Sequence, residues 1–88
     1  MKALMQYGLM AEKHWREFLP KMVAELDAMG QLHALLLEAE EKTEIELYQL
    51  RRQLMQQGMS VQQAHEQAWE IVREKYIFLP TEPPTEED

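Results

Sequence analysis

The sequence predicts an all-α protein, a small helical bundle, and three observations carry this prediction. Apolar residues recur every three or four positions along most of the chain, as they do on one face of a helix. Val and Thr are too scattered before residue 81 to form the alternating pattern of strands. The 88 residues include no cysteine and are 45% hydrophobic, so a core is possible, but disulfides and thiolate metal sites are excluded.

The first helix is expected to run from about Lys2 to Phe18. Its apolar positions alternate in steps of four and three, which is the spacing of a packed seam. The seam comprises Leu4, Gly8, Ala11, Trp15, Phe18, Met22, Leu26 and Met29. Pro20 interrupts it, because a proline inside a helix removes a hydrogen bond and clashes with the preceding turn. We expect a kink or break there, then a short helix with Pro20 at its first position, ended by Gly30 in a left-handed conformation.

A long third helix is expected from about Leu32 to Gln56, with Gly58 as its stop. Its main apolar stripe comprises Leu32, Leu35, Leu36, Ala39, Thr43, Leu47, Leu50 and Leu54. Further apolar residues lie outside this stripe: Leu37, Ile45, Tyr48 and Met55. So broad an apolar face indicates contact with more than one neighbour.

The fourth helix is expected to start at Ser60, because Ser60 and Gln63 have the spacing of a capping box. Its apolar face comprises Val61, Ala64, Ala68, Ile71, Val72 and Tyr76. The segment 76–80 is apolar on every side and ends in Pro80, so we expect it to lie across the bundle as a strap. Residues 1–80 then form a single helical domain.

Residues 81–88 are predicted to be a disordered acidic tail. They contain four acidic side chains and no basic one, and they have little apolar surface to bury. Of the net charge of −7, the tail accounts for −4. The predicted folded part is therefore only mildly acidic.

No arrangement of residues points to catalysis or to a cofactor. The Glu-x-x-His pairs of helical di-metal sites are absent from the sequence. His65 could act as a general base, but no relay partner is placed near it, and the only serine, Ser60, is used as a cap. We therefore expect a non-enzyme without cofactor, metal or small-molecule substrate. The uncharged run 28–37 is too short for a membrane span and the start lacks a secretory signal, so we expect a cytoplasmic protein.

A role with nucleic acids stays open as the alternative. Basic residues gather at Lys13, Arg16 and Lys21 and at positions 51–52 and could bind DNA or RNA weakly, but most have an acid one turn away, which favours a solvated face over direct binding. On the predicted fourth helix, three acids lie one turn apart: Glu66, Glu70 and Glu74. This row is either a solvated face or an imitation of nucleic-acid phosphates that blocks a binding protein.

Aromatic and methionine side chains favour a role in protein–protein interaction. Four short helices cannot cover all of them, and those left on the surface would make adaptable contacts. We therefore expect an interaction or accessory module that binds itself, as a homo-oligomer, or a larger protein. The candidate partner-binding residues are Trp15, Phe18, Trp69, Tyr76 and Phe78, together with the three acids Glu66, Glu70 and Glu74.

Several short segments also carry a family resemblance. They are Tyr7-Gly8-Leu9-Met10, Pro20, Gly30-Gln31-Leu32, Ala68-Trp69-Glu70-Ile71-Val72-Arg73-Glu74 and Tyr76-Ile77-Phe78-Leu79-Pro80. Over about residues 7–80 the chain resembles the small TnpV-type proteins of bacterial transposons, and also short uncharacterised cyanobacterial helical proteins. The resemblance implies an all-helical accessory protein linked to mobile bacterial DNA, without an assigned catalytic residue.

Overall fold

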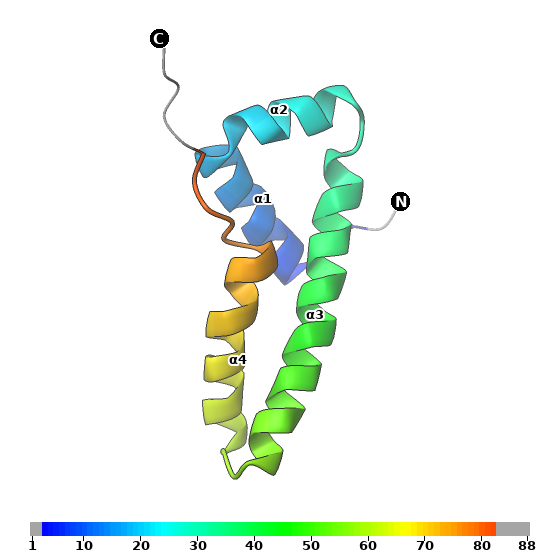
Figure 1. Cartoon of the computed structure of the whole chain (residues 1–88). Helices are drawn as coiled ribbons and strands as arrows, with labels where there is room; N and C mark the ends of the chain where they lie inside the picture. Colours follow the sequence, from blue (N-terminus) through cyan, green and yellow to red (C-terminus); the bar gives the residue numbers. More distant parts are fainter. Residues whose placement is uncertain (1–2, 83–88) are drawn as a thin grey trace.

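The computed structural model describes residues 3–82, which form four helices and no strand (Figure 1). The helices are α1 (Gln6–Phe18), α2 (Pro20–Ala28), α3 (Leu32–Gln56) and α4 (Val61–Tyr76). Long α3 pairs with α4 along most of its length, while α1 and α2 pack on its N-terminal half. The predicted all-α bundle, with three main helices and a short one after Pro20, is confirmed.

Pro20 separates two helices and does not merely kink one. Leu19 leaves the helical conformation with φ −132° and ψ 51°, and Pro20 is the first residue of α2. This break changes the helical register, so the expected seam continues into α2 only in part, where Met22 and Leu26 pack against the core. Leu19 and Val23 are buried, whereas Phe18 and Met29, which the seam placed inside, are exposed.

Glycines and a capping box end and start the helices as expected. Gly30 has φ 69° and Gly58 has φ 105°, both in the left-handed region that favours glycine. At the start of α4, the Gln63 backbone N–H donates to the Ser60 hydroxyl at 3.1 Å, and the Ser60 N–H donates to the Gln63 side chain at 3.3 Å. The predicted capping box is therefore confirmed.

The first helix begins at Gln6, later than the expected Lys2. The reason is Glu40 of α3, which the sequence did not single out. Its carboxylate accepts hydrogen bonds from the Met5 N–H at 2.9 and 3.1 Å and from the Gly8 N–H at 3.3 Å. Helix-start amides lack partners within the helix, so a carboxylate there acts as a cap and fixes where α1 begins.

The chain after α4 forms the expected strap. Ile77 is fully buried, and its carbonyl accepts a hydrogen bond from the Trp15 indole N–H at 3.1 Å. His14 Nε2 donates to the Leu79 carbonyl at 2.9 Å. These bonds hold the strap against α1.

Glu82 differs from the expectation for the tail. Its N–H donates to the Phe18 carbonyl at 3.2 Å, and its carboxylate accepts from the Met22 N–H at 2.9 Å and the Lys21 N–H at 3.3 Å. Glu82 thus caps α2, as Glu40 caps α1, and is not part of a free tail. The rest of the predicted tail, residues 83–88, lies outside the described residues.

The far end of the molecule is a two-helix arm. We use this name for residues 45–72, where α3 and α4 run side by side beyond the N-terminal end of α1 (Figure 1). The arm buries one seam: Leu47, Leu54, Ala64, Ala68 and Val72. The radius of gyration is 15.3 Å, against about 12 Å for a compact domain of this length. The fold is therefore extended and leaves much of the arm uncovered.

Candidate interaction surface

The predicted partner-binding aromatics lie in three different environments. Trp15 is 5% exposed and belongs to the core, so it offers little surface of its own to a partner. Trp69 and Phe78 lie 6.1 Å apart in a chain of ring contacts that continues through His14 to Phe18. Phe18, at 38%, is the one exposed ring of these four. The row of ring contacts therefore mainly holds the strap against α1 and α4.

Tyr76 belongs to a polar cluster between α3 and α4. Its hydroxyl donates to Glu46, which also accepts a hydrogen bond from Lys75 at 2.7 Å. The Lys75 hydrogen bond and then the Tyr76 hydrogen bond hold the pKa of Glu46 below its ordinary value. The Glu46 bond in turn raises the pKa of Tyr76 and of Lys75. This cluster ties the two helices together.

The predicted acidic row is exposed on α4. Glu66, Glu70 and Glu74 all face solvent, and Glu66 accepts a weak hydrogen bond from Gln62 at 3.4 Å. Ile71, which the sequence placed in the apolar face of α4, is 48% exposed beside this row.

The basic groups that the sequence offered for nucleic-acid binding are partly engaged within the protein. Arg16 pairs with Glu12 at 2.9 Å, one of the predicted one-turn pairs. Arg51 lies 3.3 Å from His65 Nδ1. The pairing with Glu12 lowers the charge that Arg16 presents to a phosphate, and the contact with His65 ties up one donor of Arg51 without changing its charge.

A second apolar stripe runs along α3, on the side away from its packed stripe. Ile45 and Tyr48 are each 56% exposed and Met55 is 43% exposed. Ile45 lies two positions from both Thr43 and Leu47, so it points about 160° away from each of these buried residues. The sequence predicted that the broad apolar face of α3 contacts more than one neighbour, and α3 does pack against α1, α2 and α4, but Ile45, Tyr48 and Met55 lie outside these contacts and stay exposed.

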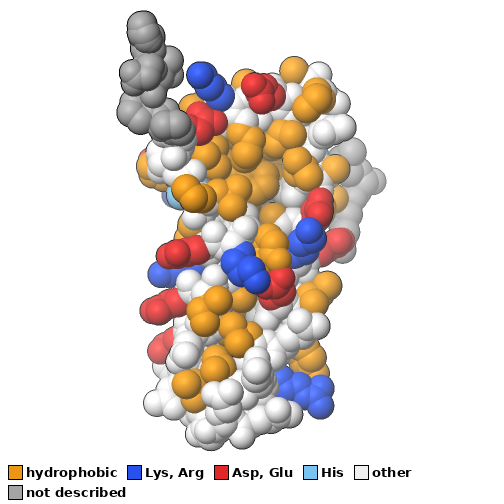
Figure 2. All heavy atoms as spheres, in the orientation of Figure 1, with side chains coloured by type: hydrophobic (Ala, Val, Ile, Leu, Met, Phe, Trp, Pro, Cys, Tyr) orange, Lys and Arg blue, Asp and Glu red, His pale blue; other side chains and the backbone are white. Residues whose placement is uncertain are grey.

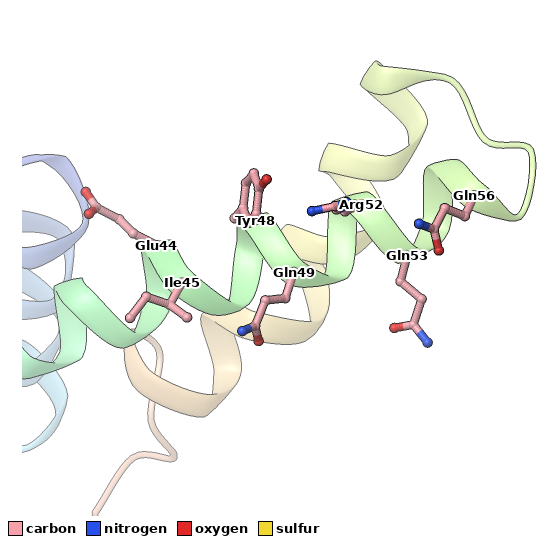
Figure 3. A pocket seen from close by; sticks show the side chains of 7 residues that line it. All are labelled: Glu44, Ile45, Tyr48, Gln49, Arg52, Gln53 and Gln56. Atoms are coloured by element: carbon pink, nitrogen blue, oxygen red, sulfur yellow. The ribbon is translucent and has the colours of Figure 1, made fainter.

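We call this stripe the α3 outer face, which consists of Ile45, Tyr48, Arg52 and Met55. The spacing of three, four and three residues is that of a helix–helix seam. Figure 3 shows Tyr48 on one edge of this side of α3, Ile45 on the other edge beside Gln49 and Gln53, and Arg52 between the two edges. Val61 of α4, 64% exposed, shares a shallow hollow with Met55 and so extends the face onto the second helix of the arm.

The charges around the α3 outer face are segregated. Glu44 lines its N-terminal end, and Arg51 and Arg52 lie toward its C-terminal end. Glu44 and Arg52 are eight positions apart, about 12 Å along the helix, and do not pair within one chain. The face therefore has an acidic residue at its N-terminal end and two basic residues in its C-terminal half, among its apolar side chains.

A different apolar surface lies on the other half of the molecule, where Figure 2 shows orange side chains gathered next to α2. It contains a pocket of about 260 Å³, which we call the Trp15 pocket. Its apolar lining is Trp15, Met22, Leu26, Leu35, Ala39 and Leu79, and its polar rim is Glu38, Lys42, Lys75 and Tyr76. It thus contains two of the predicted partner-binding aromatics, Trp15 and Tyr76.

Within residues 3–82, no group of three or more His, Asp or Glu side chains is placed to hold a metal ion. In the same range, every helix is too short or too polar to cross a membrane.

Comparison with known proteins gives no match to a family model, to a curated protein or to a solved structure. The resemblance to TnpV-type and cyanobacterial proteins therefore stays a prediction. Function has to be argued from the surfaces themselves.

Proposed function

We propose that this protein is a non-enzymatic interaction module that self-associates, with two copies pairing through the α3 outer face. The observation that carries the proposal is that the arm formed by α3 and α4 is covered on only one side of α3. The arm buries a single seam, and the opposite side of α3 presents Ile45, Tyr48 and Met55 at seam spacing to solvent. Exposed apolar residues in such a row are typical of surfaces that bind another protein.

The charge distribution favours an antiparallel pair. If α3 meets its copy with the two-fold axis near Tyr48, Glu44 of each copy lies opposite Arg52 of the other. Two-fold symmetry repeats this contact, so each dimer gains two ion pairs. A parallel pair would place like charges together at both ends, which costs free energy. The centre would bring two Tyr48 rings together, and Tyr and Arg are enriched in protein interfaces.

The expected dimer is reversible. Covering a half-exposed Ile, Tyr or Met side chain contributes about 1 kcal/mol, and the symmetry doubles the contribution of each. Val61 adds to this area, while association costs at least about 4 kcal/mol of lost freedom of motion. The balance predicts a dimer whose population rises with protein concentration.

Light scattering coupled to size exclusion, run over a range of concentrations, tests the proposal. The wild type should shift from monomer toward dimer mass as concentration rises. The double variant Tyr48→Glu/Met55→Glu should stay monomeric, because it buries charge in the seam. Ile71→Glu is the matched control, since Ile71 is 48% exposed but lies on α4 outside the face, and it should dimerise like the wild type. A wild type that stays monomeric at every concentration refutes the proposal.

A charge exchange tests the antiparallel arrangement separately. Glu44→Arg and Arg52→Glu should each weaken the dimer, because each places like charges opposite one another. The double variant should recover it, since the ion pairs re-form with their charges exchanged. Two single variants as tight as the wild type would exclude this arrangement.

A further inference from the structure

The Trp15 pocket is separate from the α3 outer face and has its own charge pattern. Its apolar walls come from α1, α2, α3 and the strap. The charged side chains in its lining are Lys42, Lys75 and Glu38, and Lys75 also pairs with Glu46 beside the pocket, so the rim carries no net charge. The whole chain carries −7, so a rim on which two lysines balance the acids differs from the general charge of the protein.

Both lysines approach the same ring at the pocket rim. The Lys42 ammonium is 6.0 Å and the Lys75 ammonium 5.8 Å from the centre of the Tyr76 ring, so the two lie at most about 12 Å apart. Each pairs with one glutamate, Lys42 with Glu38 and Lys75 with Glu46. An ammonium group has three donors, so each lysine retains donors for a further anion.

The pocket floor offers only apolar contact. The Trp15 indole N–H is occupied by the Ile77 carbonyl, so the tryptophan contributes ring surface and no free donor. Ala39, beside it in the lining, is small and leaves space. At about 30 Å³ for each small group, 260 Å³ holds roughly nine non-hydrogen atoms.

We propose that the Trp15 pocket binds a free amphipathic carboxylate, with an alkyl or aryl body of about nine carbons in the pocket and the carboxylate between Lys42 and Lys75. Ligand pockets are typically apolar with a few convergent polar groups that fix orientation, and this pocket has that composition. The proposal departs from the expectation that the protein has no small-molecule ligand. It requires no chemical reaction and does not depend on self-association.

Three probes with the same tail and different head groups test it: decanoate, decanol and decyltrimethylammonium. The protein carries Trp69→Phe, which leaves Trp15 as the only tryptophan. Below micelle-forming concentrations, decanoate should shift Trp15 emission saturably. Decanol and the cationic probe should bind at least roughly tenfold more weakly than decanoate, because neither is attracted to the lysines. Equal binding of all three probes, or no saturable shift with decanoate, overturns the proposal.

Two variants locate the site. The double variant Lys42→Gln/Lys75→Gln should lower decanoate affinity roughly tenfold and leave decanol unchanged, since only the anion uses the rim. Ala39→Leu should abolish binding of all probes by filling the pocket. Circular dichroism checks that each variant remains helical. If Ala39→Leu unfolds, the decanoate affinity of Lys42→Gln/Lys75→Gln still tests the proposal, because both lysines are exposed and their replacement should leave the fold intact. If Trp15 emission changes with protein concentration but not with added decanoate, a second copy of the protein covers the pocket. This result also overturns the proposal.

Discussion

Glu40 offers a sharp test of how the two halves of the bundle are joined. The residue is 4% exposed in the middle of α3, and its carboxylate receives the N–H groups of Met5 and Gly8 from the start of α1. Replacing Glu40 with Ala removes the hydrogen-bond acceptor and leaves a small cavity. Replacing it with Gln keeps the shape but removes the charge and turns an amide N–H₂ toward N–H donors.

The magnitude follows from these contacts. Each hydrogen bond to a charged group contributes about 1.5–3 kcal/mol net, and loss of an N-terminal cap typically costs about 1 kcal/mol. In the variant, water can hydrogen-bond to the freed N–H groups at the start of α1 and so offset part of the lost free energy. We therefore expect Glu40→Ala to cost about 2–4 kcal/mol of stability. A chain of this size has roughly 4–13 kcal/mol of stability in total. The melting temperature should therefore fall by about 10–25 °C, with Glu40→Gln between this variant and the wild type.

Chemical denaturation followed by circular dichroism measures the loss. Glu70→Ala is the control, since Glu70 is an exposed glutamate on a helix, and it should stay within about 0.5 kcal/mol of the wild type. Hydrogen exchange adds a local readout, because the Met5 and Gly8 amides should lose protection in Glu40→Ala. If Glu40→Ala were as stable as Glu70→Ala, the capping argument would be wrong.

Three further predictions concern single positions. Thr43 is fully buried and its hydroxyl has no partner among the described residues, so Thr43→Val should raise stability by about 1 kcal/mol in urea unfolding. Alanine usually stabilises a helix by about 1 kcal/mol relative to glycine. At Gly8, however, a methyl group would lie 2.9 Å from the Leu4 side chain. Gly8→Ala should therefore leave the stability measured by urea unfolding unchanged or lower it. The lowered pKa of Glu46, caused by Lys75 and then Tyr76, stabilises the fold above pH 4.5, and this is lost as pH falls through the folded-state pKa. The raised pKa of Tyr76 gives a contribution that is present below pH 10.0 and lost as pH rises through its folded-state value, so Glu46→Gln should flatten the stability curve at both ends.

Features that depend on local sequence were predictable. The bounds of α3, the glycine stops and the Ser60 capping box all follow from residues within a few positions of each other. The strap followed from Pro80 and the continuous apolar segment before it. In each case the physical cause, a backbone conformation or a side-chain-to-backbone bond, lies inside a short window.

Features that join distant segments were not predictable. Glu40 reads in the sequence as one of several surface glutamates, and only the approach of α1 makes it a cap. Glu82 likewise caps a helix 60 positions away. Trp15 was placed in the apolar seam and also named as a partner-binding candidate, because a helical pattern does not show which apolar residues a strap will cover. The α3 outer face was visible only as apolar residues outside the main stripe, since its exposure depends on which sides of α3 the other helices cover.

Disulfide trapping tests the antiparallel pairing most directly, because the chain has no cysteine of its own. The double variant Glu44→Cys/Arg52→Cys should oxidise rapidly to a covalent dimer. Each single variant should not, since the two copies of either position lie about 12 Å apart along the helix and a disulfide needs Cα atoms within about 7 Å. Single variants that cross-link as fast as the double one, or a double variant that stays monomeric, would contradict the pairing.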